Sequence, residues 1–190
     1  MNYTLLFAIL LLSKCTPETM PSQPTTTDTI TIFDFSATTP PDSWFVQDDV
    51  VMGGRSDGNI ETTDAGYGRF HGKVSLENNG GFSSIRHNPE APVEVAGKEK
   101  FILRLRGDGS KYTIRVNDDP DKRYYYQYTF PTTGEWQEIE VPFADMKPVF
   151  RGRNLDLPNY AGGPVTRVQF LIGNKRAQTF EVLLDWMRAV

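Results

Sequence analysis

Alternation of apolar and polar residues constrains the fold of this chain more than any other feature. In FILRLR (101–106) and YTIRVN (112–117), every second side chain forms an apolar row. Neighbouring side chains on a β-strand point to opposite faces, so a period of two predicts half-buried strands. Between the two segments lies Gly107-Asp108-Gly109-Ser110, which is typical of a β-hairpin turn.

Similar segments, rich in β-branched and aromatic residues and bounded by turn residues, occur along most of the chain, and no segment shows a sustained helical stripe. Besides the two above, strands are expected at 30–35, 59–63, 68–75, 82–87, 124–130, 136–141, 168–172 and 180–186. Roughly ten short strands separated by frequent turns predict an all-β fold, an antiparallel β-sandwich or jelly roll.

The single cysteine, Cys15, follows the apolar run LLFAILLL (5–12). That run has the length of a signal peptide and is shorter than the roughly 20 residues of a spanning helix. Residues 11–15, LLSKC, resemble a bacterial lipobox, although Lys14 stands where a small residue is usual. We therefore expect residues 1–15 to be a signal peptide ending in a lipidated cysteine, in a membrane-anchored lipoprotein of the bacterial cell envelope. An uncleaved anchor and an ordinary secreted or periplasmic protein are the alternatives.

Residues 16–29, TPETMPSQPTTTDT, are rich in proline and threonine and predict an extended tether before one domain at 30–190. The net charge of −4 provides no overall basic field, so nucleic acid is not an expected partner.

The stretch DDVVMGGRSDG (48–58) combines acids, paired glycines and an arginine. It is either a recognition loop in which Arg55 and Ser56 face a partner, or a turn. The turn hypothesis is favoured: it places the turn at Gly53-Gly54, packs 50–52 beneath it, and pairs Asp48 or Asp49 with Arg55 or Arg86.

A second glycine-containing loop, ENNGG (77–81), separates two predicted strands. The amide of Asn79, followed by Gly80 and Gly81, is suited either to hydrogen bonds with a sugar or to a type I′ turn, and the turn is favoured.

Strand alternation also predicts a polar row opposite the apolar rows. If their strands are neighbours, its members form one face suited to sugar hydroxyls or an acidic protein, with Glu138 and Glu140 nearby to balance the charge. An ordinary solvated sheet face is an equal alternative. The candidate residues are Arg104, Arg106, Arg115, Tyr125, Gln127 and Gln169.

Catalytic and metal sites find little support. His71 and His87 have no zinc-ligand spacing, and Cys15 is the only thiol. The acidic loop at 117–121 lacks the fuller ligand pattern of a calcium site and is interpreted as a solvated turn. Paired carboxylates for glycoside hydrolysis have no defined site here. We expect no catalytic residue, no metal and no cofactor.

Four segments in order carry a family resemblance: WFVQDDVVMGGRS (44–56), VSLENNGGFSSIR (74–86), LRGDG (105–109) and FRGR (150–153). Together they resemble the complex I intermediate-associated protein 30 family across nearly all of 30–190. The resemblance implies a galactose-binding-like jelly roll, related to carbohydrate-binding modules, without known catalytic activity. Mitochondrial members assemble respiratory complex I through protein contacts, so a protein-binding or assembly module of the envelope is the leading hypothesis. A carbohydrate-binding module using the polar sheet face is the alternative, because fold alone does not fix function.

Overall fold

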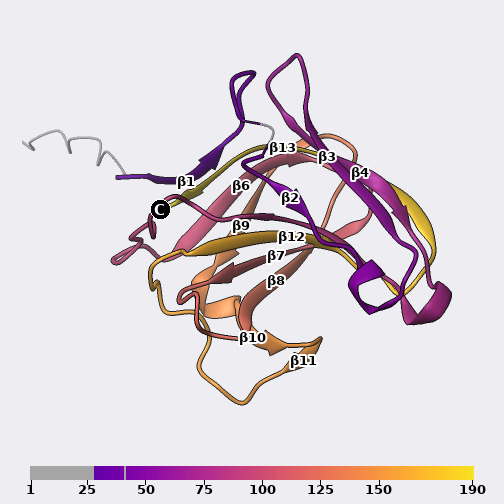
Figure 1. Cartoon of the computed structure of the whole chain (residues 1–190). Coiled ribbons are helices and arrows are strands. Elements are labelled where there is room, and N and C mark those ends of the chain that lie inside the picture. Colours follow the sequence, from indigo (N-terminus) through magenta and orange to yellow (C-terminus); the bar gives the residue numbers. More distant parts are fainter. Residues whose placement is uncertain (1–27, 41) are drawn as a thin grey trace, which may run out of the picture.

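The computed structural model describes residues 28–40 and 42–190, and Figure 1 shows them as two β-sheets packed face to face. The predicted leader with Cys15 and residues 16–27 of the predicted tether lie outside the described residues. Within the described ranges, helical structure is confined to three 3-10 turns, η1 (Asp49–Met52), η2 (Glu77–Asn79) and η3 (Phe143–Asp145). No helix in these ranges is long and apolar enough to cross a membrane.

The first sheet has six strands and is organised around the long strand β13. Both β4 and β1 pair with one edge of β13, and β6 pairs with its other edge. In spatial order, the strands are β3 (Asp57–Thr62), β4 (Gly68–Val74), β13 (Gln178–Ala189), β6 (Lys100–Arg106) and β9 (Trp136–Pro142), with β1 (Ile30–Asp34) beside β13.

The second sheet has seven strands, and its ladders, like those of the first sheet, are antiparallel. In spatial order, the strands are β11 (Arg153–Asn154), β10 (Lys147–Phe150), β8 (Tyr125–Pro131), β7 (Lys111–Asn117), β12 (Arg167–Ile172), β5 (Ser83–His87) and β2 (Phe45–Val46). The predicted antiparallel β-sandwich is confirmed.

All ten predicted strands are present within a few residues of their expected bounds. Three further strands, β2, β10 and β11, were not predicted. Each has only two to four residues, and β10 contains Pro148. Such segments are too short to show an alternation of apolar and polar residues. They are strands because they pair with a neighbour, and local propensity does not predict that pairing.

The hairpin predicted at Gly107–Ser110 is wrong, and the glycine-containing loop at 77–81 is a connection between the sheets. The segment Gly107–Ser110 joins β6 of the first sheet to β7 of the second, and the loop 75–82 joins β4 of the first to β5 of the second. In the latter loop, positive φ falls on Asn78 (54°) and Asn79 (60°), while Gly80 has a φ of −66°, so the turn is not the expected Asn-Gly type I′ turn. Both loops therefore cross the sandwich.

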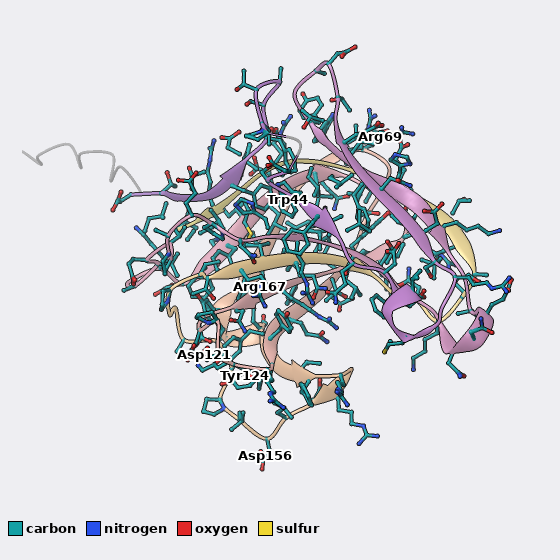
Figure 2. All side chains as sticks on the ribbon, in the orientation of Figure 1. Trp44, Arg69, Asp121, Tyr124, Asp156 and Arg167 are labelled. Atoms are coloured by element: carbon teal, nitrogen blue, oxygen red, sulfur yellow. The ribbon has the colours of Figure 1, made fainter. Side chains whose placement is uncertain are left out.

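The core lies between the sheets and is filled by the apolar rows. Phe101, Leu103 and Leu105 from β6 are buried, as the alternation predicts. Trp44, just before β2, closes one side of the core by packing against Phe33 with a ring-centroid distance of 5.1 Å. Figure 2 shows Trp44 in the interior and Arg69 on the outer surface.

The carboxylate of Asp49 is fully buried and joins three segments at one end of the sandwich. One oxygen accepts a hydrogen bond from Ser56 N at 3.0 Å, and the other accepts from Ser56 Oγ at 2.6 Å, Gly81 N at 2.6 Å and Phe82 N at 3.1 Å. The turns η1 and η2 thus lie side by side, as Figure 1 shows. A buried carboxylate with this many donors is a strong structural tie.

Two glycines make room for this carboxylate. A Cβ on Gly54 would lie 2.2 Å from Asp49 Oδ1, and one on Gly80 would lie 2.7 Å from Asp49 Oδ2. Gly53, with a φ of 91°, supplies the left-handed residue at the end of η1. Within the pair Gly53-Gly54, Gly53 provides the left-handed backbone conformation and Gly54 leaves room for the carboxylate.

The expected pairing of Asp48 or Asp49 with an arginine is wrong. Asp48 accepts from Gly58 N at 2.8 Å and Ser83 Oγ at 2.5 Å. Arg55 is exposed and pairs with Glu77 at 3.2 Å. The expected packing beneath the turn is also wrong for Val50 and Met52, which are 58% and 67% exposed. Backbone N–H and hydroxyl donors satisfy these acids, so no arginine is needed.

The first prediction concerns Asp49→Asn. Burial alone would raise the pKa of Asp49, but the hydrogen bonds from Ser56, Gly81 and Phe82 outweigh it and hold the pKa below its ordinary value. An amide would turn an NH2 group toward N–H donors, so we expect a loss of about 2–4 kcal/mol in the free energy of unfolding at pH 7. Urea unfolding followed by tryptophan fluorescence measures it.

The effect has a defined pH dependence. Because the folded pKa of Asp49 is lowered, its contribution is present above pH about 4 and is lost as pH falls through the folded pKa. The difference between wild type and variant should therefore shrink in acid. Asp57→Asn, an exposed acid on β3, is the control and should have little effect. Equal stability of Asp49→Asn and Asp57→Asn would contradict the proposed role.

Candidate binding groove

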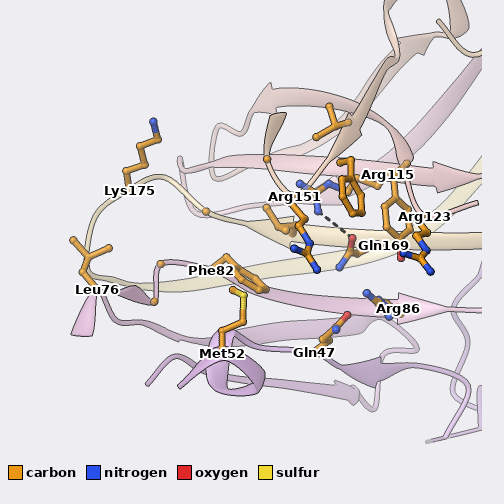
Figure 3. A pocket seen from close by; sticks show the side chains of 18 residues that line it. Gln47, Met52, Leu76, Phe82, Arg86, Arg115, Arg123, Arg151, Gln169 and Lys175 are labelled. Carbon is orange, nitrogen blue, oxygen red and sulfur yellow. Dashed lines mark hydrogen bonds between the residues drawn. The ribbon is translucent and has the colours of Figure 1, made fainter. Parts of the chain in front are cut away.

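A groove of about 1030 Å³ crosses the outer face of the seven-stranded sheet. Its floor is formed by side chains of β5, β7, β8 and β12, and its rim by η1 and the loops after β4, β10 and β12. In the view of Figure 3, Met52 and Phe82 lie toward one side, Arg86 and Arg123 toward the other, with Arg151 and Gln169 between them.

The floor of the groove is a row of polar residues at matching register. Arg86 on β5 lies opposite Gln169 on β12, Gln169 lies opposite Arg115 on β7, and Arg115 lies opposite Gln127 on β8. Residues directly opposite each other in an antiparallel ladder present their side chains on the same face. The expected polar face therefore exists for Arg115, Gln127 and Gln169 and for Tyr125, two positions before Gln127 on β8, and Arg86 extends it.

Two amides hold the guanidinium of Arg115. Its Nε donates to Gln127 Oε1 at 3.1 Å, and one terminal nitrogen donates to Gln169 Oε1 at 3.3 Å. Gln169, only 3% exposed, in turn donates through Nε2 to Ser84 Oγ at 2.9 Å. The dashed line in Figure 3 marks the Arg115–Gln169 bond. This network fixes the orientation of Arg115 before any ligand arrives.

Arg86 is less satisfied than Arg115. Its guanidinium carbon lies 6.0 Å from the ring centroid of Tyr125, whose hydroxyl accepts from Arg167 at 3.3 Å. The buried Nε of Arg86 and Oε1 of Gln47, both lining the groove, make no hydrogen bond within the described part of the chain. Both atoms are buried, so each is an unpaired polar group beneath the groove surface.

The rim contributes charged groups that strand alternation did not identify. Arg151 and Gly152 form the turn between β10 and β11, with φ values of 47° and 76°. Arg123 precedes β8 and Lys175 lies in the loop after β12. The FRGR motif (150–153) was visible in the sequence, but only the hairpin shows that its first arginine lies at the groove.

The groove is positively charged. Of its 18 lining residues, five are Arg or Lys and none is Asp or Glu. Within residues 28–40 and 42–190, none of the five takes part in an ion pair. Desolvation lowers the pKa of both Arg86 and Arg115. Charge is thus held here at an energetic cost.

Arg104 and Arg106 do not belong to this face, which corrects the expectation of a single polar face of six residues. Both lie on β6, in the other sheet, because 107–110 crosses the sandwich. Arg104 pairs with Asp185 and lies 4.6 Å from the ring centroid of Trp136. Glu138 is its cross-strand neighbour, whereas Glu140 pairs with Lys100.

The groove is lined without carboxylate, imidazole or thiol groups, since its lining residues include no Asp, Glu, His or Cys. Among residues 28–40 and 42–190, no cluster of three or more such side chains is placed to hold a metal ion. In the acidic loop at 117–121, Asp118 pairs with Lys122 at 2.8 Å, and Asp119 accepts from Asp121 N at 2.9 Å. The groove, with its unpaired arginines and amides, is suited to holding a polar, anionic group.

The fold is a β-sandwich similar to that of solved carbohydrate-binding modules. A family 11 carbohydrate-binding module from Clostridium thermocellum, solved with a β-1,3-1,4-mixed-linked tetrasaccharide, superposes with a TM-score of 0.61 at 13% identity, covering 85% of this chain and 95% of that one. The agarase AgWH50C gives a TM-score of 0.54 at 13% identity, covering 85% of this chain and 24% of the agarase. At such identities, these similarities establish the fold alone.

The chain belongs to the complex I intermediate-associated protein 30 (CIA30) family, whose model matches residues 33–184. The resemblance noted in the sequence is thus confirmed. The chain is 28% identical over 153 residues to the mitochondrial complex I intermediate-associated protein 30 of Drosophila melanogaster. The match covers 68% of this chain and 51% of the fly protein. An uncharacterized Schizosaccharomyces pombe protein, C9E9.15, is 25% identical over 179 residues, covering 79% of this chain and 81% of that one.

The second prediction concerns the cost of charge in the groove. Arg86→Met keeps the length of the side chain and removes a desolvated charge whose buried Nε has no hydrogen-bond partner in the described chain, so we expect the free energy of unfolding to rise by up to about 1 kcal/mol. Arg69→Met is the matched control, because Arg69 pairs with Glu61 at 2.8 Å and Glu181 at 2.6 Å on the outer surface. The control should lower stability. Denaturant unfolding at pH 7 measures both, and a clear loss in Arg86→Met would show that Arg86 serves the fold.

Proposed function

We propose that this domain is a non-catalytic binding module that holds a carbohydrate chain in the groove of the seven-stranded sheet. The observation that carries the proposal is the row of Arg86, Gln169 and Arg115, together with the ring of Tyr125, in one groove. Guanidinium and amide groups pair with sugar hydroxyls, and an aromatic ring packs on the apolar face of a pyranose.

The shape of the site supports a chain-like ligand. The groove runs across several strands, and its volume of about 1030 Å³ is at the upper end of ordinary small-molecule sites. The solved family 11 module with a bound tetrasaccharide has the same fold, which supports the proposal without deciding it. The absence of carboxylate pairs from the groove lining supports binding rather than glycoside hydrolysis.

Assembly of a protein complex is the second candidate function. It is favoured by membership of a family named for complex I intermediates and by apolar side chains at the groove rim. Met52 and Leu76 are 67% and 46% exposed, and both line the groove. Exposed apolar side chains beside charged ones are typical of a protein interface.

The third prediction separates these functions. Full-length protein in a sugar-free polyoxyethylene detergent is screened against a broad glycan array, and hits are titrated by calorimetry. We expect binding to one glycan class, weakened about tenfold or more by Tyr125→Ala through loss of the ring contact. Tyr67→Ala, a tyrosine that packs on Trp136 away from the groove, is the control and should bind normally.

Two outcomes would count against carbohydrate binding. One is equal affinity of Tyr125→Ala and wild type, which would place the glycan elsewhere. The other is no glycan binding, combined with crosslinking from Met52 to one dominant protein that is lost in Met52→Asp. The latter would favour the assembly function.

We also propose that residues 1–15 anchor the domain to a membrane through a lipid on Cys15, in a bacterial cell envelope. Support comes from the apolar run and the lipobox-like LLSKC. As the fourth prediction, mass spectrometry of protein from its native host should show a mass increase on Cys15. Cys15→Ser should release the protein from the membrane fraction, while Ser13→Ala should not. Unmodified, soluble native protein would contradict the anchor.

A further inference from the structure

Positive charge gathers at the groove against the overall balance of the protein. The chain has a net charge of −4, yet Arg86, Arg115, Arg123, Arg151 and Lys175 line one groove without an acidic residue among the lining groups. Elsewhere in the described ranges, arginines such as Arg69 and Arg104 pair with carboxylates. Several cations outside the groove are therefore paired with carboxylates, whereas none of the five groove cations takes part in an ion pair within the described residues.

The spacing of the floor arginines suits a chain with repeated charges. Arg86 and Arg115 lie at the same register on β5 and β7, with β12 between them. Since neighbouring strands are about 4.8 Å apart, the two backbone positions are separated by about 10 Å. Gln169 on β12 lies between them and accepts a hydrogen bond from Arg115. Because a strand separates the two arginines, each can contact a different negative group of one ligand.

The arginine at the rim is held there at a conformational cost. Arg151 adopts the left-handed region, with a φ of 47°, at the first position of a two-residue turn where asparagine or glycine is preferred. Its position projects the side chain toward the groove, as Figure 3 shows. Strained residues cluster at functional sites, so the conformation of Arg151 favours a role for its charge in binding.

The groove lies on the face of the sheet and not at an edge. Peptides often bind by adding a strand to a sheet edge, where backbone groups are free. On this floor, the backbone groups of β5, β12 and β7 are already paired in their ladders. Only side chains face the ligand, which favours a ligand that presents hydroxyl and acidic groups over a peptide backbone.

We propose that the ligand is an acidic carbohydrate, whose carboxylate or sulfate groups are bound by Arg86 and Arg115 on the floor and by Arg151 and Lys175 at the rim. This inference rests on the proposed carbohydrate-binding function and names the class of ligand that the groove would bind. Guanidinium groups bind carboxylate and sulfate oxygens through paired, charge-assisted hydrogen bonds. Arg86, Arg115 and Arg151 bring such guanidinium groups to the groove.

The fifth prediction compares ligands that differ only in charge. The probes are tetragalacturonate and its fully methyl-esterified form, and a κ-carrageenan tetrasaccharide before and after desulfation. Full-length protein in the sugar-free detergent is titrated by calorimetry at 50 and 200 mM salt. We expect at least one acidic probe to bind about tenfold tighter or better than its neutral form, with affinity falling as salt rises.

Matched variants locate the effect. Arg151→Gln and Lys175→Gln each remove one exposed charge at the rim without disturbing the core, and their combination should reduce the preference for the acidic probe at least threefold. Arg86→Gln should reduce it further. Arg176→Gln, next to Lys175 but outside the lining residues, is the control and should leave the preference unchanged.

The outcomes separate the two proposals. Equal binding of acidic and neutral probes would overturn the acidic-ligand inference and leave carbohydrate binding in place. Failure of every probe and of the wider glycan array would overturn both. Tighter binding of hexaglutamate than of any acidic saccharide would also overturn the inference, in favour of an acidic peptide.

Discussion

The buried carboxylate of Asp49 is the interaction on which the groove end of the sandwich depends. It joins η1, the start of β3 and the loop before β5, three segments that arrive from different sheets. The same segments carry Met52, Gly80 and Phe82 to the groove rim. Acid, serine and two glycines form one unit, since Ser56 donates to the carboxylate while Gly54 and Gly80 leave space for it. Polar residues in a loop motif thus shape a site without touching its ligand.

Charge is used in two different ways in this molecule. On the six-stranded sheet, Arg69 lies between Glu61 and Glu181, and Arg104 pairs with Asp185 beside the ring of Trp136. On the seven-stranded sheet, Arg86 and Arg115 face only amides, a tyrosine ring and other cations, and desolvation lowers the pKa of both. A domain selected for stability alone would place carboxylates there. Their absence from the lining is a cost that the proposed binding of a negative group would offset.

Much of the fold could be predicted from the sequence, because alternation reports which side of a strand faces the core. Phe101, Leu103 and Leu105 are buried as expected. Turn residues, by contrast, indicate that the chain reverses and do not indicate whether the next strand joins the same sheet. The hairpin expected at Gly107–Ser110 was wrong for this reason, and Arg104 and Arg106 were consequently assigned to the wrong face.

The candidate site was predictable only in part. Alternation identified Arg115, Tyr125 and Gln169, whose place at the groove depends on their own strands. It did not identify Arg86 as a floor residue, nor Arg151 and Lys175, because loop side chains reach the groove only through tertiary structure. Net charge was similarly uninformative, since a value of −4 conceals a local cluster of opposite sign.

The position of β13 has a consequence for how the domain forms. This strand comes after all the others in the six-stranded sheet, yet it lies between β4 and β6 and also pairs with β1. Until residues 178–189 have left the ribosome, β1 and β4 lack the neighbour that connects them to β6. Contacts so distant in sequence give a high contact order and slow folding. The seven strands of the other sheet are all made before β13, so the six-stranded sheet is the part of the domain that can close only at the end of synthesis.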